Sequence, residues 1–106
     1  MPGIARGHGA DTVNSPDGSG RCCAYHSTQY TEECSDNVFI NGIGVVRLGD
    51  NMRTHNYPGP CCDPHNPPLD TSSATVFVNG RAVGRIGDAY GGNHIIISCS
   101  PNVNAG

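Results

Sequence analysis

The sequence is poor in the residues that build a large core. It has no Trp, six aromatic residues and 36% apolar residues in all. The strong helix formers Leu, Lys, Glu and Gln are scarce, and no stretch shows the apolar stripe of an amphipathic helix. Fifteen Gly and eight Pro among 106 residues instead indicate one turn-rich, all-β domain spanning 1–106, with little or no helix. Such a small chain with so little apolar mass needs disulfides, a metal or a partner to stabilise it.

Charge is also sparse. The net charge is -3 and the six basic residues form no run, which argues against nucleic acid as the main partner because phosphate recognition needs clustered cations. The first residues contain no apolar run of signal-peptide length, and no segment is long enough to cross a bilayer. We expect a protein without a cleaved signal.

What the sequence does have is an internal repeat. The segment Asn37–Asp50 returns as Thr75–Asp88, with eight of fourteen positions identical and a period of 38 residues. Each copy contains an apolar run, an Asn-Gly pair and a second apolar run that ends in Gly-Asp. Asn-Gly is the preferred pair for a two-residue type I′ turn, so each copy predicts a β-hairpin.

The two ends of the chain together form a third copy. Cys99–Val103 matches Cys34–Val38, whereas Gly3–Arg6 resembles the second strands at Gly44–Arg47 and Ala82–Arg85. We therefore predict three hairpins around a pseudo-threefold axis, the third shared between the termini. Such closure hides strand edges that would otherwise aggregate.

Long polar loops separate the copies, at about residues 7–36, 51–74 and 89–100. Loops of this length in a small domain are usually functional or pinned. They carry a possible metal set: Cys62 and His65 at Cys-x-x-His spacing, His55 upstream and His94 in the next loop. Three His and one Cys suit tetrahedral Zn²⁺, and a thiolate favours Zn over Fe.

The six cysteines have other readings. Three disulfides, or two with a free pair, would also stabilise a small chain. Cys22 or Cys23 could pair with Cys61 while Cys62 binds metal. Cys34 and Cys99 precede equivalent strands, which favours a packing role. His8 stays ambiguous, and His26 completes a second Cys-x-x-His and is a weaker candidate for a second metal.

Catalysis has less support. The acidic residues that might serve as a general base follow turn signals or Pro, where Asx-type hydrogen bonds explain them: Asp50, Asp63, Asp70 and Asp88. A zinc hydrolase needs an open coordination position and a nearby base, and no spacing singles one out. We expect no enzyme activity.

The repeated Val-Phe-x-Asn-Gly…Arg-x-Gly-Asp pattern resembles the strand units of PAAR-repeat proteins over essentially the whole chain. The signature tetrapeptide is degenerate here, at Gly44–Arg47, Ala82–Arg85 and Gly3–Arg6. The resemblance implies a small cone that caps the blunt end of a trimeric β-helical spike, one tip per trimer. Such tips sharpen contractile phage tails or type VI secretion needles for transient contact with a target cell envelope.

The resemblance also implies Zn²⁺ near the apex, carried here by His55, Cys62, His65 and His94, with Cys61 the nearest competitor for the thiolate. The base would bind the spike through apolar hairpin residues: Val38, Ile40, Val76 and Val78. We expect a monomeric, non-enzymatic tip, located in a virion at the tail baseplate or, alternatively, exported by a contractile secretion system. A small disulfide-stapled secreted binding module is the alternative.

Overall fold

The computed structural model describes residues 2–15, 27–54 and 66–106. The all-β prediction is confirmed: the secondary structure of these residues consists of short strands and turns, without helix. The strands are β1 (Thr12–Ser15), β2 (Ser27–Tyr30), β3 (Phe39–Ile40), β4 (Ile43–Gly44), β5 (Phe77–Val78), β6 (Arg81–Ala82), β7 (Ala89–Tyr90) and β8 (His94–Ile96). The described part of the chain offers no helix with the length and apolar character that a membrane crossing requires.

The repeated segments form two matching hairpins. In the first hairpin β3 pairs with β4, and in the second β5 pairs with β6, both antiparallel with the same register. Asn41 and Gly42 have φ of 55° and 77°, and Asn79 and Gly80 have 55° and 76°. Two successive left-handed residues define the type I′ turn that the Asn-Gly pairs predict.

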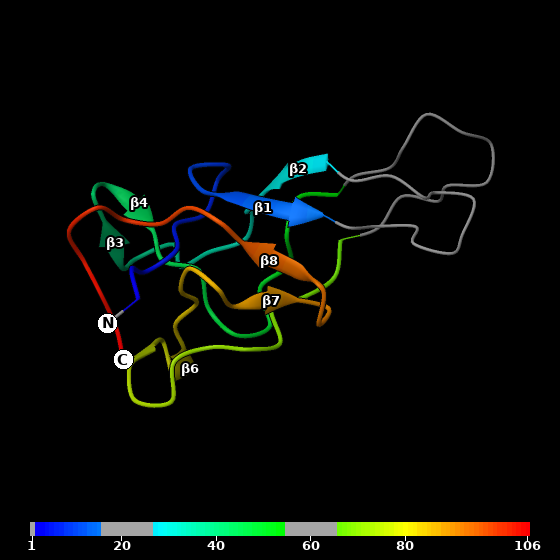
Figure 1. Ribbon diagram of the computed structural model, residues 1–106. Coiled ribbons are helices and arrows are strands. Elements are labelled where there is room, and N and C mark those ends of the chain that lie inside the picture. Colours follow the sequence, from blue (N-terminus) through cyan, green and yellow to red (C-terminus); the bar gives the residue numbers. More distant parts are fainter. Residues whose placement is uncertain (1, 16–26, 55–65) are drawn as a thin grey trace.

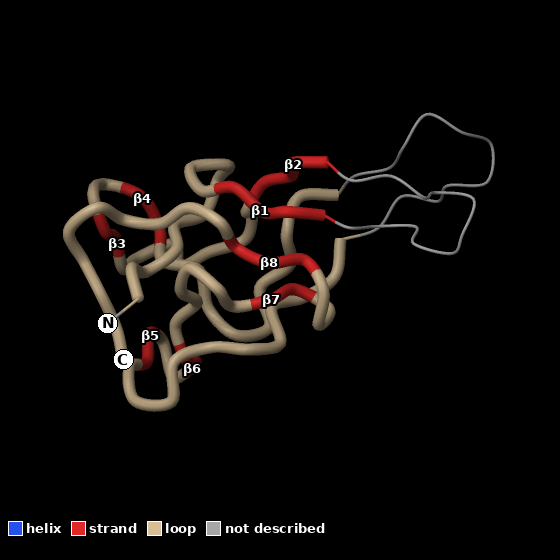
Figure 2. Tube along the Cα trace, in the orientation of Figure 1, coloured by secondary structure: helices blue, strands red, loops and turns tan. Residues whose placement is uncertain are grey.

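The two chain ends complete a third hairpin, which we call the terminal hairpin (residues 103–106 with 2–6). Gly3 bridges Asn104, and the Ala105 amide donates to the Pro2 carbonyl at 2.9 Å. In Figures 1 and 2 the two chain ends lie close together, between the β3–β4 and β5–β6 hairpins. The predicted sharing of one copy between the termini is therefore confirmed.

A closed ring of backbone hydrogen bonds joins the three hairpins. The Ala5 amide donates to the Gly84 carbonyl (2.9 Å), Gly84 to Val46 (2.8 Å) and Val46 back to Ala5 (3.1 Å). Isolated bridges repeat the same cycle between neighbouring hairpins: Ile4 with Arg85, Arg6 with Val45, and Arg47 with Val83. This ring is the physical basis of the pseudo-threefold axis.

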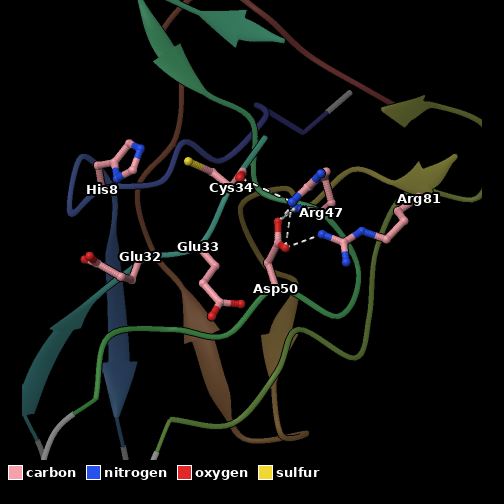
Figure 3. A pocket seen from close by; sticks show the side chains of 7 residues that line it. All are labelled: His8, Glu32, Glu33, Cys34, Arg47, Asp50 and Arg81. Carbon is pink, nitrogen blue, oxygen red and sulfur yellow. Dashed lines mark hydrogen bonds and ion pairs between the residues drawn. The ribbon is translucent and has the colours of Figure 1, made fainter. Parts of the chain in front are cut away.

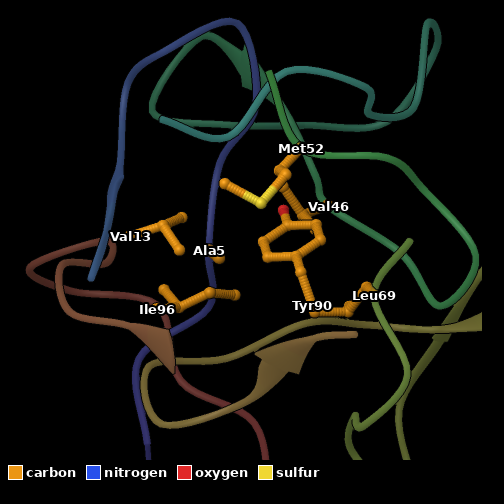
Figure 4. Packing of buried hydrophobic residues seen from close by; sticks show 7 residues of the cluster. All are labelled: Ala5, Val13, Val46, Met52, Leu69, Tyr90 and Ile96. Carbon is orange, nitrogen blue, oxygen red and sulfur yellow. The ribbon is translucent and has the colours of Figure 1, made fainter. Parts of the chain in front are cut away.

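Two hydrophobic clusters follow from the alternation of side chains along these strands. The hairpin cluster consists of Ile4, Val45, Val83 and Ala105, against which Ile40, Val76, Val78 and Val103 pack. The sheet cluster, shown in Figure 4, consists of Ala5, Val13, Val46, Met52, Leu69, Tyr90 and Ile96. Consecutive residues such as Val45 and Val46 therefore serve different clusters.

A four-stranded sheet in the order β2-β1-β8-β7 lies next to the hairpins, as Figure 2 shows. The sequence prediction placed these strands in polar loops, and their pairing was missed. Val13 pairs with Ile96 across 83 positions of sequence, so no local signal announces the contact. Of the side chains of Thr12–Asn14 only one is fully buried. A single buried residue is too little to produce a recognisable alternation of apolar and polar residues in the sequence.

Candidate functional site

His94 is the one predicted metal ligand within the described residues. It begins β8, pairs with Tyr90 of β7, and has only 4% of its surface exposed. Its Nδ1 lies 2.6 Å from Asn93 Oδ1. Since a carboxamide oxygen can only accept, Nδ1 carries a proton, and in the neutral ring Nε2 then keeps the lone pair that a metal needs. The residue thus fits a zinc ligand in burial and tautomer.

The other three predicted ligands, His55, Cys62 and His65, lie outside the described residues, as do Cys22, Cys23, Cys61 and His26. Within residues 2–15, 27–54 and 66–106, no three His, Cys, Asp or Glu side chains come together to hold a metal. A zinc centre built on His94 would draw its remaining ligands from 55–65.

Tyr90 of β7 is the cross-strand partner of His94, and its side chain is fully buried in the sheet cluster (Figure 4). Its hydroxyl finds no hydrogen-bond partner among the described groups. Burial, followed by the negative charge of Asp50, raises the pKa of Tyr90 well above its usual value. The phenol is therefore neutral and inert, and it cannot act as an acid or base near neutral pH.

Three Arg–Asp pairs repeat around the axis, and sequence reasoning missed them as a set. In each pair the Asp accepts the backbone amide of the Arg and two hydrogen bonds from its guanidinium: Arg6 with Asp11, Arg47 with Asp50, and Arg85 with Asp88. The Asp side chains are 1–8% exposed. These bonds raise the pKa of each Arg further, so all three stay charged.

Asp11 is the member that the repeat hides. Asp50 and Asp88 follow their Arg by three positions, whereas Asp11 follows Arg6 by five because Gly7–Ala10 replace a two-residue turn. Each Arg also donates to a backbone carbonyl in the segment that precedes its own hairpin. Arg6 donates to Cys99, Arg47 to Cys34 and Arg85 to Ser72. The repeated Arg is therefore a structural crosslink rather than a free binding group.

Serine and asparagine side chains tie each hairpin to the next. The hydroxyls of Ser35 and Ser100 accept backbone amides of their own turns and donate to Asn79 and Asn41 (2.7 and 2.6 Å). The third such serine, Ser73, donates to the Gly106 carbonyl, which stands where the other hairpins have Asn. From donor to acceptor, these serine bonds run around the axis in the opposite direction to the backbone ring.

The four residues predicted to face a spike lie on the two continuous hairpins. Val38 is 37% exposed, and Ile40, Val76 and Val78 are half-buried against the hairpin cluster. The two phenylalanines point the other way on the same strands and are the most exposed large apolar residues of the described chain: Phe39 at 57% and Phe77 at 60%. The hairpins thus keep apolar surface toward solvent on both faces.

An open cavity of about 420 Å³ lies beside the first hairpin (Figure 3). Its lining combines acidic, basic and thiol groups: His8, Glu32, Glu33, Cys34, Arg47, Asp50 and Arg81. Asp50 is held by both Arg47 and Arg81. Burial, and then Asp50, raises the pKa of the Cys34 thiol, so it stays protonated and is a poor nucleophile. Within this lining, Asp50 is the residue that the two arginines neutralise.

Cys34 and Cys99 are free, half-buried thiols, in line with the predicted packing role. Each occupies space that a neighbouring glycine leaves open: a Cβ at Gly44 would stand 2.6 Å from the Cys34 sulfur, and one at Gly3 would collide with the Cys99 sulfur. A framework of three disulfides is therefore not formed, since it would need both thiols.

Comparison of the chain with models of known protein families finds no match, and a comparison with characterised proteins finds none either.

Proposed function

We propose that the chain is a non-enzymatic tip that caps a trimeric β-helical spike of a contractile tail or secretion needle. The observation that carries the proposal is the closed backbone ring of Ala5, Val46 and Gly84. It gives one chain three equivalent hairpins, and a pseudo-threefold surface is what a single subunit needs to cover a true threefold end. The resemblance to PAAR-repeat proteins supplies the identity of the partner.

The contact surface in this proposal is the apolar side of the hairpins around Val38, Ile40, Val76 and Val78. Ile40, Val76 and Val78 pack against the hairpin cluster, so they present a fixed apolar surface. Binding would bury this surface without reorganising the hairpins, which lowers the entropic cost of association. No reactive group is required for this role.

Zinc is the second part of the proposal. His94 and the predicted ligands His55, Cys62 and His65 would hold one Zn²⁺ and fix the 55–65 segment to β8. The bound metal supplies folding free energy, of order 10–16 kcal/mol for small zinc-dependent folds. A tip that is pushed into an envelope gains most from such a crosslink where the chain has little core.

The partner claim is tested by mixing the chain with the trimeric spike of the same tail and measuring the mass of the complex. We expect one chain per trimer; three chains per trimer would contradict the cap. Val38→Asp should weaken binding at least tenfold, because it places a charge in an apolar contact. Ile97→Asp is the matched control, since Ile97 is 47% exposed but follows β8 rather than a hairpin, and it should bind normally.

The zinc claim is tested by metal analysis with counting of free thiols. We expect one tightly bound Zn per chain and a large loss of thermal stability in chelator. His94→Ala should remove the metal, whereas His8→Ala, at an exposed residue, should not. A protein with no metal and no free thiol would instead support the disulfide-stapled binding module. The free thiols of Cys34 and Cys99 argue against a framework of three disulfides in that module.

A further inference from the structure

Asn41 and Asn79 close the contacts between neighbouring hairpins, and each is followed by glycine. The Asn41 side chain accepts from Ser100 Oγ (2.6 Å) and donates from Nδ2 to Asn102 Oδ1 (3.0 Å). We call this pair of bonds the Asn41 latch. It joins the first hairpin to the segment that leads into the terminal hairpin.

The Asn79 latch has the same two bonds and one more. Its Oδ1 accepts from Ser35 (2.7 Å) and its Nδ2 donates to Asn37 (2.9 Å). In addition, a guanidinium nitrogen of Arg47 donates to Asn79 Oδ1 at 3.1 Å. Arg6 holds the equivalent position for Asn41, but none of its hydrogen bonds within the described chain reaches Asn41.

Asn-Gly pairs are the most reactive sequence for spontaneous deamidation, because glycine leaves its amide nitrogen unhindered. Asn41, Gly42, Asn79 and Gly80 are all exposed to solvent, and a Cβ at either glycine would meet nothing within 4 Å. Water and base therefore reach both turns. The latches are the remaining constraint on each side chain.

We propose that Asn41 is a deamidation site whose conversion opens its latch, whereas conversion of Asn79 leaves its latch closed. In the reaction, the Gly42 amide gives its proton to hydroxide and its nitrogen bonds to Cγ of Asn41. The bond from Cγ to the side-chain nitrogen breaks, and ammonia leaves with a proton from water. Water then opens the cyclic imide to aspartate or isoaspartate, so the balance is asparagine plus water to acid plus ammonia.

The two products differ because of Arg47. Either carboxylate can still accept from its serine, and each loses the donor that the amide nitrogen supplied. At position 79 the new negative charge lies against the Arg47 guanidinium and gains a charge-assisted bond. At position 41 it faces the Asn102 oxygen, and no cation of the described chain donates to it, so the donor is lost uncompensated. The inference is independent of the spike and of zinc.

The first test compares substitutions in the full-length chain by thermal unfolding. Asn79→Asp should be more stable than Asn79→Ala, whereas Asn41→Asp should be no more stable than Asn41→Ala. Because each Asp is compared with Ala at the same left-handed position, the backbone cost of leaving Asn is similar at both sites. We expect the two differences to differ by roughly 4–8 °C in Tm, and the gap to shrink at about 1 M salt. Equal differences would overturn the proposal.

The second test ages the wild-type protein at mildly alkaline pH and digests the folded material briefly with a protease. Peptide mapping by mass then gives the acid content at each turn in the cut and the resistant fractions. We expect conversion at position 41 to be enriched in the cut fraction and conversion at position 79 to be equal in both. Enrichment at position 79, or no conversion at position 41 while the urea-unfolded chain converts, would refute the proposal.

Discussion

The two continuous hairpins and the terminal hairpin have one backbone design and different chain connectivity. All three take part in the ring of Ala5, Val46 and Gly84, and all three carry the Arg–Asp crosslink. The terminal hairpin nevertheless lacks the connecting Asn-Gly turn and uses the Gly106 carbonyl in its place. Backbone hydrogen bonds and buried ion pairs therefore define the repeat, and the turn is replaceable.

The hairpins also differ in how they fill the space outside the second strand. Cys34 stands against Gly44, and Cys99 stands against Gly3. At the equivalent positions of the second hairpin the chain has Ser72 and Ala82. Ser72 is smaller than the Cys of the other two hairpins, and Ala82 is larger than their Gly. The summed volume of the two side chains is therefore similar in all three hairpins, although the residue types differ. This is the pattern expected of a close-packed interior.

The largest expected effect comes from removing an aspartate of the ring. Asp50→Ala leaves Arg47 and Arg81 without their carboxylate, in a site where the Asp side chain is 3% exposed. Breaking a buried pair in this way costs about 3–5 kcal/mol, measured by urea unfolding. Asp88→Ala, which removes the carboxylate from one arginine, Arg85, and from the Thr71 hydroxyl, should cost less. Equal losses would mean that Arg81 contributes nothing to the first hairpin.

A smaller effect tests the volume exchange. Ser72→Cys should destabilise the second hairpin by about 1–3 kcal/mol through overpacking against Ala82, and Ala82→Gly should cost about 0.5–1 kcal/mol. The double variant restores the Cys–Gly pair of the other repeats, so it should be more stable than the sum of the two losses predicts. Strict additivity in chemical unfolding would show that these positions do not share space.

A gain in stability is expected in the sheet cluster. Tyr90→Phe removes a buried hydroxyl that lacks a partner among the described groups, which should stabilise the fold by about 1–2 kcal/mol. The pKa of Tyr90 is raised in the folded state, so the unfolded chain loses this proton first. Stability should then fall by about 1.4 kcal/mol per pH unit above roughly pH 10. Tyr90→Phe should not show this loss of stability at alkaline pH, whereas Tyr30→Phe, at an exposed tyrosine, should still show it.

The smallest effect belongs to an ion pair away from the ring. Arg53 binds Glu32 at 2.7 Å, but the two side chains are 44% and 45% exposed. Such pairs contribute about 0–1 kcal/mol, so Arg53→Ala should barely change the unfolding midpoint even though its contact with the Tyr30 ring is also lost. A loss as large as that of Asp50→Ala would erase the distinction between the ring and the surface.

Sequence predicted the hairpins well because their signals are local. Asn41-Gly42 and Asn79-Gly80 fix the turn type, and the repeat itself shows which strands are equivalent. Strands β1 and β8 were missed because Val13 finds Ile96 only through the fold. Asp11 was missed because two extra residues move it out of register. His94 was named as a ligand from its place in the loop after the second hairpin, whereas its partners in the predicted centre lie outside the described residues.

The ring of Ala5, Val46 and Gly84 closes on itself, so the chain travels once around an axis and meets its own beginning. The seam at the terminal hairpin is then a matter of numbering rather than of architecture. A permuted chain in which an Asn-Gly pair joins Ala105 to Pro2, with Asn in place of Gly106, and which is opened between Asn79 and Gly80 would keep the hydrogen bonds of the ring. Placing the chain ends at any of the three hairpin turns would give three orders of the hairpins along the chain for the same fold, each with its ends on the same side of the molecule.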